Sequence, residues 1–255
     1  MNKEFWMEHM TWPEIEQAQK NGYDTVLLIA GSIEQHGPHL PLGTDTLLGY
    51  AMADAIARKM GKTLVAPVIR PGLSEHHMHF KGSLTLSKET FQATVREIVH
   101  SLVRHGFKRI AITYSHGGNA GALAELIPQL AHNYPDVEIL TLPDGEDQFF
   151  DPVKSILEAD GITPEQMGVH AGEMETSMLL AWEEELVRKD KMEAGFQADF
   201  AKEGEKLSQA LAQGLHSLTK NGILGDARPA DKARGERYLD AVAEFIAKKF
   251  VRVQP

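Results

Sequence analysis

The amino-acid sequence predicts an α/β fold in which a mostly parallel central sheet lies between layers of helices, a three-layer sandwich. Short apolar runs alternate with helical patterns through the first 142 residues, which is typical of βαβ units. The chain has 255 residues, of which 42% are hydrophobic, and this is enough to bury a large core. We expect one domain spanning residues 1–255.

The elements follow from periodicity and from the residues that end each segment. The apolar run 24–30 predicts a first strand, and 64–68 predicts a second. Between them, leucine and alanine at three- and four-residue spacing predict a helix over about 45–60. Ser87 is placed to cap a further helix that carries Phe91, Val95, Ile98 and Leu102 on one face and ends at Gly106.

The pattern continues with a strand at 109–114, a helix at about 120–132 that Asn119 can cap, and a strand at 137–142. The stretch 143–168 is rich in Pro, Gly and Asp and predicts a loop that wraps over the edge of the site. A helix follows through Trp182.

Composition excludes several function classes. Lys and Arg number 26 against 36 Asp and Glu, a net charge of −10, which argues against nucleic acid or an anionic membrane as the main partner. Cysteine is absent, so any metal must be held by nitrogen and oxygen ligands. No apolar stretch reaches the length of a membrane span or a secretory signal. We therefore expect a cytoplasmic protein.

The segment 31–45 is the first candidate site, because it places metal ligands directly after the strand 24–30. Glu34 and His36 are two residues apart, so in extended backbone both side chains leave on the same side. Asp45 follows across a loop that can fold back and let one carboxylate bridge two ions. Imidazole and carboxylate together are suitable ligands for a catalytic divalent ion.

Two more segments carry polar residues that can join this site. His116 follows the strand 109–114 directly, and the carboxyl ends of parallel strands meet at one edge of a sheet. The segment His170-Ala171-Gly172-Glu173-Met174-Glu175 opens the later helix. Its acids can serve the chemistry, or they can simply favour the positive end of the helix dipole.

The remaining histidines are given less direct roles. The segment 73–80 holds three of them, His76, His77 and His79. We interpret these as lining the substrate or supporting the ligands; a metal site and a solvated loop remain the alternatives. Five further histidines have no partners nearby in the sequence and are interpreted as structural, namely His39, His100, His105, His132 and His216.

Four blocks of this sequence resemble the creatininase family in content and order. They are Gly31-Ser32-Ile33-Glu34-Gln35-His36-Gly37-Pro38-His39-Leu40-Pro41-Leu42-Gly43-Thr44-Asp45, Gly82-Ser83-Leu84-Thr85-Leu86, His116-Gly117-Gly118-Asn119 and 170–177. The resemblance implies an α/β fold, a homohexamer, and a binuclear site of Zn, Mn or Fe. It also implies that Glu34 and His116 hold one ion, that His36 holds the other, and that Asp45 bridges them.

The sequence departs from the creatininases at two positions of the site. They carry a glutamate ligand where this chain has Gly118, and an acid where it has Val169. Glu173 is the candidate replacement ligand, with Glu175 as the second choice. His170 matches a histidine that acts near the substrate, and His170 or Glu175 would carry the proton during the reaction.

The predicted function is a metal-dependent hydrolase that uses a metal-bridged hydroxide to cleave the C–N bond of a small cyclic amide or formamide. The alternative enzyme opens a cyclic ketone such as a keto-inositol by C–C cleavage in polyol breakdown. A sheet protein that only stores or assembles around metal is the non-enzymatic alternative. A nucleotide-binding protein fits poorly, because no Gly-rich phosphate loop follows a predicted strand.

Overall fold

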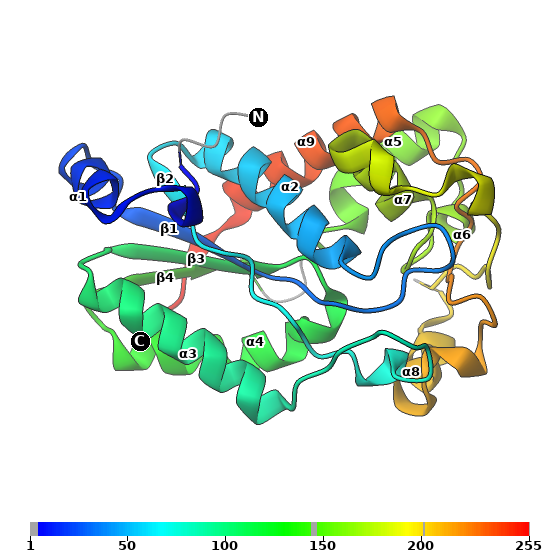
Figure 1. Cartoon of the computed structure of the whole chain (residues 1–255), viewed down its shortest axis with the longest axis horizontal. Coiled ribbons are helices and arrows are strands. Elements are labelled where there is room, and N and C mark those ends of the chain that lie inside the picture. The colour runs from blue at the N-terminus through cyan, green and yellow to red at the C-terminus, as the bar shows by residue number, and fades with distance from the viewer. Residues whose placement is uncertain (1–4, 144–146, 201, 255) are drawn as a thin grey trace.

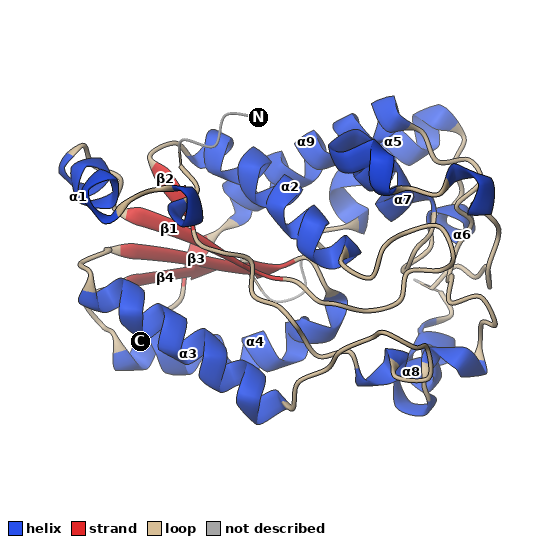
Figure 2. Ribbon diagram, viewed as in Figure 1, coloured by secondary structure: helices blue, strands red, loops and turns tan. Residues whose placement is uncertain are grey.

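The computed structural model describes residues 5–143, 147–200 and 202–254. Its centre is a sheet with the strand order β2-β1-β3-β4-β5 (Figure 2). The strands are β1 (Thr25–Ala30), β2 (Thr63–Val65), β3 (Arg109–Tyr114), β4 (Glu138–Thr141) and β5 (Val251–Arg252). The first four pair in parallel, and β5 runs antiparallel to β4. The predicted α/β fold with a mostly parallel sheet is therefore confirmed.

One face of the sheet is covered by α3 (Lys88–Arg104) and α4 (Ala120–Asn133), drawn below the strands in Figure 1. Of the α3 residues predicted to face the sheet, Phe91, Val95 and Leu102 are buried, whereas Ile98 is only partly buried and its neighbour Val99 is buried instead. They pack in one hydrophobic cluster with alternate residues of β1, including Val26 and Leu28. Burial of this apolar surface supplies the main driving force for placing the two helices here.

The other face is covered by α2 (Thr44–Met60), α5 (Phe150–Asp160), α7 (Glu173–Glu183) and α9 (Lys232–Lys249), drawn above the strands in Figure 1. Leu27 and Ile29, the remaining alternate residues of β1, belong to this second cluster. Helices α7 and α9 cross closely, because a Cβ built on Gly235 would lie 1.9 Å from the carbonyl oxygen of Ser177. Only glycine permits that approach.

Three shorter helices lie at the ends of the molecule, namely α1 (Trp12–Lys20), α6 (Pro164–Met167) and α8 (Gly204–Gln213). The predicted loop over 143–168 is wrong for most of its length, since it contains α5 and α6. Thr163 caps α6 by accepting from the backbone N–H of Gln166, and Gly161 ends α5 in the left-handed conformation. Across the described ranges, every helix is too short or too polar to cross a membrane.

The expected cap of α4 by Asn119 is also wrong. Its amide nitrogen instead donates to the carbonyl oxygens of Ala30 and Gly31, at 3.1 and 3.0 Å, and its amide oxygen accepts from the backbone N–H of Leu73 at 3.0 Å. The side chain thus ties the end of β1 to the loop after β2. This places the loops that carry the candidate ligands at one edge of the sheet.

Candidate metal centre

The loop after β1 brings Glu34 and His36 to the carboxyl edge of the sheet. The backbone N–H of Glu34 donates to the carbonyl oxygen of Leu42 at 2.8 Å, so the chain folds back on itself. Ile33 also pairs with Leu84 in an isolated antiparallel bridge. Both Glu34 and His36 are completely buried, as a ligand pair held by backbone contacts would be.

Asp45 lies between two imidazoles. It sits in the first turn of α2 and is buried, where the helix dipole favours a carboxylate. Its Oδ1 is 3.2 Å from His36 Nε2, and its Oδ2 is 3.3 Å from His116 Nδ1. Each oxygen of one carboxylate therefore faces a different histidine.

Both imidazoles are oriented by backbone carbonyls on their far side. His36 Nδ1 donates to the carbonyl oxygen of Glu34 at 3.1 Å, and His116 Nε2 donates to that of Leu73 at 3.0 Å. A carbonyl only accepts, so in each neutral ring the other nitrogen has the free lone pair. That nitrogen faces the carboxylates, which is the orientation of a metal-ligating histidine.

The turn before α7 contributes His170, and the first turn of α7 contributes Glu175. Glu175 Oε2 is 3.8 Å from His36 Nε2, and His170 Nδ1 is 3.8 Å from Glu34 Oε1. Ala171, between them, is fully buried and has a φ of 53°, a left-handed conformation that L-residues other than Asn and Asp seldom adopt. Its backbone N–H donates to Glu175 Oε2 at 2.5 Å, so the strained turn fixes the carboxylate in place.

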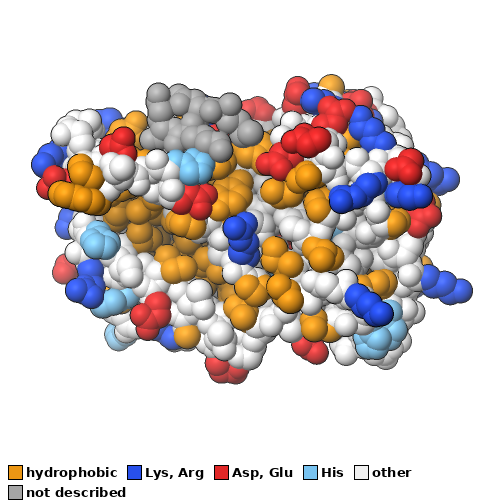
Figure 3. All heavy atoms as spheres, in the orientation of Figure 1, with side chains coloured by type: hydrophobic (Ala, Val, Ile, Leu, Met, Phe, Trp, Pro, Cys, Tyr) orange, Lys and Arg blue, Asp and Glu red, His pale blue; other side chains and the backbone are white. Residues whose placement is uncertain are grey.

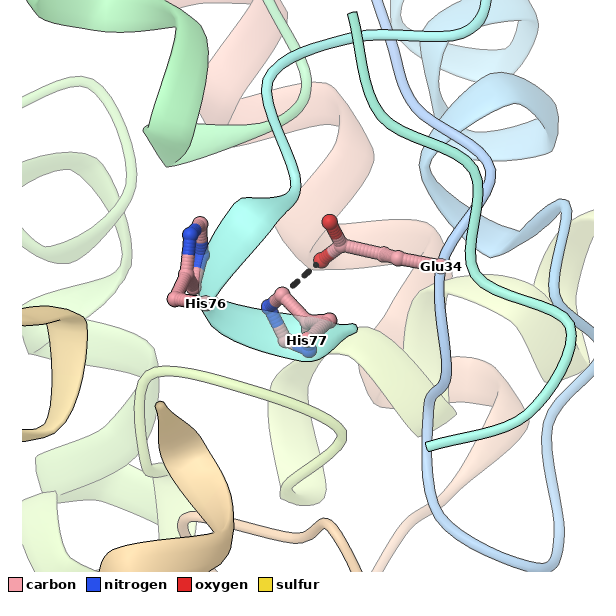
Figure 4. A group of neighbouring side chains, drawn as sticks. All are labelled: Glu34, His76 and His77. Carbon is pink, nitrogen blue, oxygen red and sulfur yellow. Dashed lines mark ion pairs between the residues drawn. The ribbon is translucent and has the colours of Figure 1, made fainter. Parts of the chain in front are cut away.

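The segment 73–80 supplies two neighbours of Glu34, as Figure 4 shows. His77 Nε2 is 3.1 Å from Glu34 Oε1, and His77 Nδ1 is 3.0 Å from the amide nitrogen of Gln35. An amide nitrogen only donates, so the proton of a neutral His77 ring lies on Nε2 and faces the carboxylate. His77 is thus placed to support Glu34, while His76 lines the cavity beside it.

Glu173 is not brought to this cluster. Its carboxylate accepts from Ser177 Oγ at 2.6 Å and from Tyr238 Oη at 2.9 Å, and it pairs with Arg234 Nη1 at 3.0 Å. All of these partners belong to α7 or α9, and burial raises the pKa of this carboxyl. The structure therefore places Glu173 as an anchor between two helices, with Glu175 as the acid of this segment in the cluster.

Gly118, which stands where the creatininases carry a glutamate, has no room for a side chain. A Cβ built there would lie 2.3 Å from His116 Nε2 and 2.5 Å from the carbonyl oxygen of Leu73. These are the two atoms whose hydrogen bond orients His116. The glycine is therefore required by the orientation of its neighbour.

The electrostatics of the cluster favour added positive charge. Burial raises the pKa of Glu34 to about 7, partly opposed by His116. Burial disfavours the charged ring of His36, but the carboxylates of Asp45, Glu175 and Glu34 outweigh it and raise its pKa to about 10. The pKa of His116 is raised to about 9, because Glu34 and Asp45 outweigh its burial. A divalent cation would take over the role of these protons.

The ligand atoms form groups that suit two ions. Glu34, Asp45 and His116 place ligand atoms within 4.8 Å of one another, and so do His36, Asp45 and Glu175. The two groups share Asp45. Among the described residues, Glu34 Oε1, His36 Nε2 and Asp45 Oδ2 are buried and make no well-aligned hydrogen bond, although their ion-pair partners lie 3.1–3.3 Å away. Such atoms are costly to bury unless a cation satisfies them. The oxygen and nitrogen donors present therefore fit a pair of divalent ions.

A cavity of about 330 Å³ opens onto the cluster. Glu34, Asp45, His116, Glu175 and His170 line one part of it. Three protein ligands with access to a cavity are typical of a catalytic metal site rather than a closed structural one.

Comparison with known proteins places the chain in a family. The sequence model of the creatininase family, described as creatinine amidohydrolase, matches residues 8–250. This chain belongs to the creatininase family. The predicted family is thus confirmed, and with it the prediction of a metal-dependent hydrolase.

The relatives named in this family differ in what they act on. The mycofactocin precursor peptide peptidase of Mycolicibacterium smegmatis is 32% identical, over 90% of this chain and 85% of that protein. The creatinine amidohydrolase of Pseudomonas putida is 27% identical, over 97% of this chain and 96% of that protein. A solved structure of a mutant creatininase of Zn–Zn type covers 96% of both chains at 26% identity, with a TM-score of 0.75.

Sequence reasoning missed Gln35, which lies between two candidate ligands. Its side-chain amide nitrogen contacts His77 Nδ1 and donates to the carbonyl oxygen of Gly222, both at 3.0 Å, while its amide oxygen accepts from the backbone N–H of Gly37. The only sequence feature that could have indicated Gln35 was its position between Glu34 and His36. Its side chain positions His77, and it is itself held by Gly222, which lies 187 positions away in the chain.

Proposed function

We propose that this protein hydrolyses the C–N bond of a small amide with the help of two divalent ions. Glu34 and His116 would hold one ion, His36 and Glu175 the other, and Asp45 would serve both. The observation that carries this proposal is the position of Asp45, whose two carboxylate oxygens face two separate imidazoles at 3.2 and 3.3 Å. The position of Glu175 in the second ligand group supports its assignment in place of Glu173.

When bound, such ions polarise a carbonyl oxygen and lower the pKa of a water molecule toward 7. The chain itself supplies orientation and proton transfer. Backbone carbonyls hold the rings of His36 and His116, so their ligand nitrogens need no rearrangement. His170 donates from Nε2 to the carbonyl oxygen of Gln35 at 2.7 Å, which leaves Nδ1 toward the cluster. That nitrogen is positioned to accept a proton and pass it to the leaving amine.

The test combines metal analysis with a substrate panel. We expect the purified protein to contain two divalent ions per chain by emission spectroscopy. We also expect it to hydrolyse at least one member of a panel of formamides, cyclic amides and short peptide amides. Chelation should abolish that activity, and the restored metal should return it. Cleavage of cyclic keto-inositols without any amide hydrolysis, or full activity after chelation, would contradict the proposal.

The finer expectations have separate tests. We propose zinc, manganese or iron as the metal, and metal analysis of protein from unsupplemented medium distinguishes them. We propose a homohexamer, for which light scattering should give six times the 28.2 kDa mass of the chain. We propose a cytoplasmic location, which cell fractionation tests. Charges of both signs are scattered over the face in Figure 3.

A further inference from the structure

Two kinds of side chain line the cavity at the metal ligands. One kind is the acids and histidines of the cluster. The other kind is apolar, and we call the apolar members that come from residues 167–224, outside α7, the apolar wall: Met167, Val169, Leu207, Leu211, Leu215 and Leu224. A substrate bound in this cavity therefore has apolar surface beside the ligands.

Half of the apolar wall packs separately from the main core: Leu207, Leu215 and Leu224 belong to a small third cluster, whereas Met167 belongs to a large one. Leu207 and Leu211 are four residues apart on α8, so both point to the same side of the helix. Leu215 follows in a short 3-10 turn, Leu215–Ser217. It packs with Leu224 and two more buried residues in a small hydrophobic cluster of its own. The packing of this cluster therefore holds Leu215 and Leu224 of the apolar wall in place.

Parts of the wall remain exposed to solvent. Leu211 is 47% exposed and Val169 is 44% exposed, although both line the cavity. A single exposed apolar residue is common on protein surfaces. Here two of them, from separate elements, line one cavity beside buried Leu215 and Leu224. A ligand with an apolar group would remove this surface from water and gain free energy.

The charges of the side chains that line the cavity also favour an uncharged substrate. Among the described residues that line the cavity, none is Lys or Arg, whereas Asp147 joins the acids of the cluster. Beyond the metal ligands, a substrate carboxylate would therefore find no cationic partner and would meet Asp147. A buried charge without a partner is costly.

We propose that the substrate is an amide that carries an uncharged aliphatic or aromatic group of several carbons, seated against the apolar wall. This inference rests on the proposed function and adds the class of substrate. The cavity of about 330 Å³ lies at the small end of the range of ligand pockets, about 300–1,000 Å³. A compact polar ring would leave the wall uncovered.

The test uses a series of straight-chain hydroxamic acids, from acetohydroxamate to hexanohydroxamate, and measures their binding to the metal-loaded protein by calorimetry. Their common head group binds metal, so only the chain length varies. We expect the dissociation constant to fall about three- to fourfold for each added methylene, on the order of 100-fold over the series. A chain of the same length that ends in a carboxylate should bind at least about tenfold more weakly.

Two matched variants assign the effect to the wall. Leu211→Gln should reduce the dependence of binding on chain length. Trp12→Gln, at a tryptophan of α1 that is 79% exposed and does not line the cavity, should leave that dependence as in the natural protein. If binding depended on chain length equally in both variants, α8 would not contribute to the binding of the substrate.

The outcomes separate this inference from the proposed function. Binding that changes less than twofold across the series, or equal binding of the carboxylate-terminated chain, would overturn the inference even if formamides are hydrolysed. Steep dependence on chain length, with no amide in the substrate panel hydrolysed, would support the apolar wall and contradict the proposed reaction.

Discussion

Replacing Glu173 by Gln should lower the stability of the fold and leave the metal content unchanged. Replacing Glu175 by Gln should lower the metal content and leave the stability of the fold unchanged. The two acids are two positions apart on α7, which turns them about 200° away from each other around the helix axis. Glu173 consequently faces Arg234 and Tyr238 of α9, and Glu175 faces His36.

The magnitudes follow from the partners that each change leaves behind. Glu173→Gln removes one charge from a buried ion pair, which costs roughly 3–5 kcal/mol when the partner is left alone. Arg234 keeps Asp160 at 3.1 Å as a second partner, so we expect the lower end, about 3 kcal/mol. For a chain of this size that lowers the midpoint of thermal unfolding by about 6–12 °C. Glu175→Gln should weaken metal binding by more than about 10- to 100-fold, the loss typical of residues that only support a ligand.

Thermal unfolding and emission spectroscopy on the same preparations distinguish the two roles. Glu185→Gln is the control, because this acid lies just beyond α7 and is exposed; it should change neither quantity. If Glu173→Gln lost metal at an unchanged unfolding temperature, Glu173 would be a ligand and the assignment of the two acids would be reversed.

Three further changes test other parts of the site and the fold. Asp45→Asn should lose both ions and all amide hydrolysis while the far-ultraviolet circular dichroism stays unchanged; two ions in that variant would contradict a shared carboxylate. Gly235→Ala should lower the free energy of unfolding by about 1–3 kcal/mol, since the added Cβ forces α9 away from the carbonyl of Ser177; an unchanged urea midpoint would exclude the close crossing. Ala171→Gly should alter stability by less than about 1 kcal/mol, because relief of a left-handed φ offsets the flexibility of glycine. Ala171→Val should cost more than that, and equal urea midpoints for the two variants would argue against the strained turn.

The core of the sheet could be predicted because its signals are local. β1 and β3 are mostly apolar, and α3 shows a clear apolar stripe, so each was found within a residue or two of its observed bounds. Helix α9 was not predicted at all. Its apolar residues, among them Tyr238, Val242 and Ile246, are spaced for one face but stand among many charged residues. Its place was set by packing against α7, which no local pattern reveals.

The site shows the same division between local and distant information. Glu34 and His36 could be paired from their spacing, and Asp45 could be added because one loop connects it to them. The choice between Glu173 and Glu175 depended on which side of α7 faces the sheet. That orientation is decided by Arg234 and Tyr238, some sixty positions further along the chain. Without the docked helix, the sequence favoured Glu173 as the ligand and left Glu175 as the second choice.

The separate packing of α8 has a consequence for how this family can diversify. The candidate metal ligands follow strand ends or lie in first helical turns, and the two large clusters fix these strands and helices in place. Leu215 and Leu224 belong to a small third cluster instead. Mutations can accumulate there and reshape what the cavity accepts, with the reaction centre untouched. Related proteins could thus inherit the same catalytic residues while each lineage evolves its own substrate specificity.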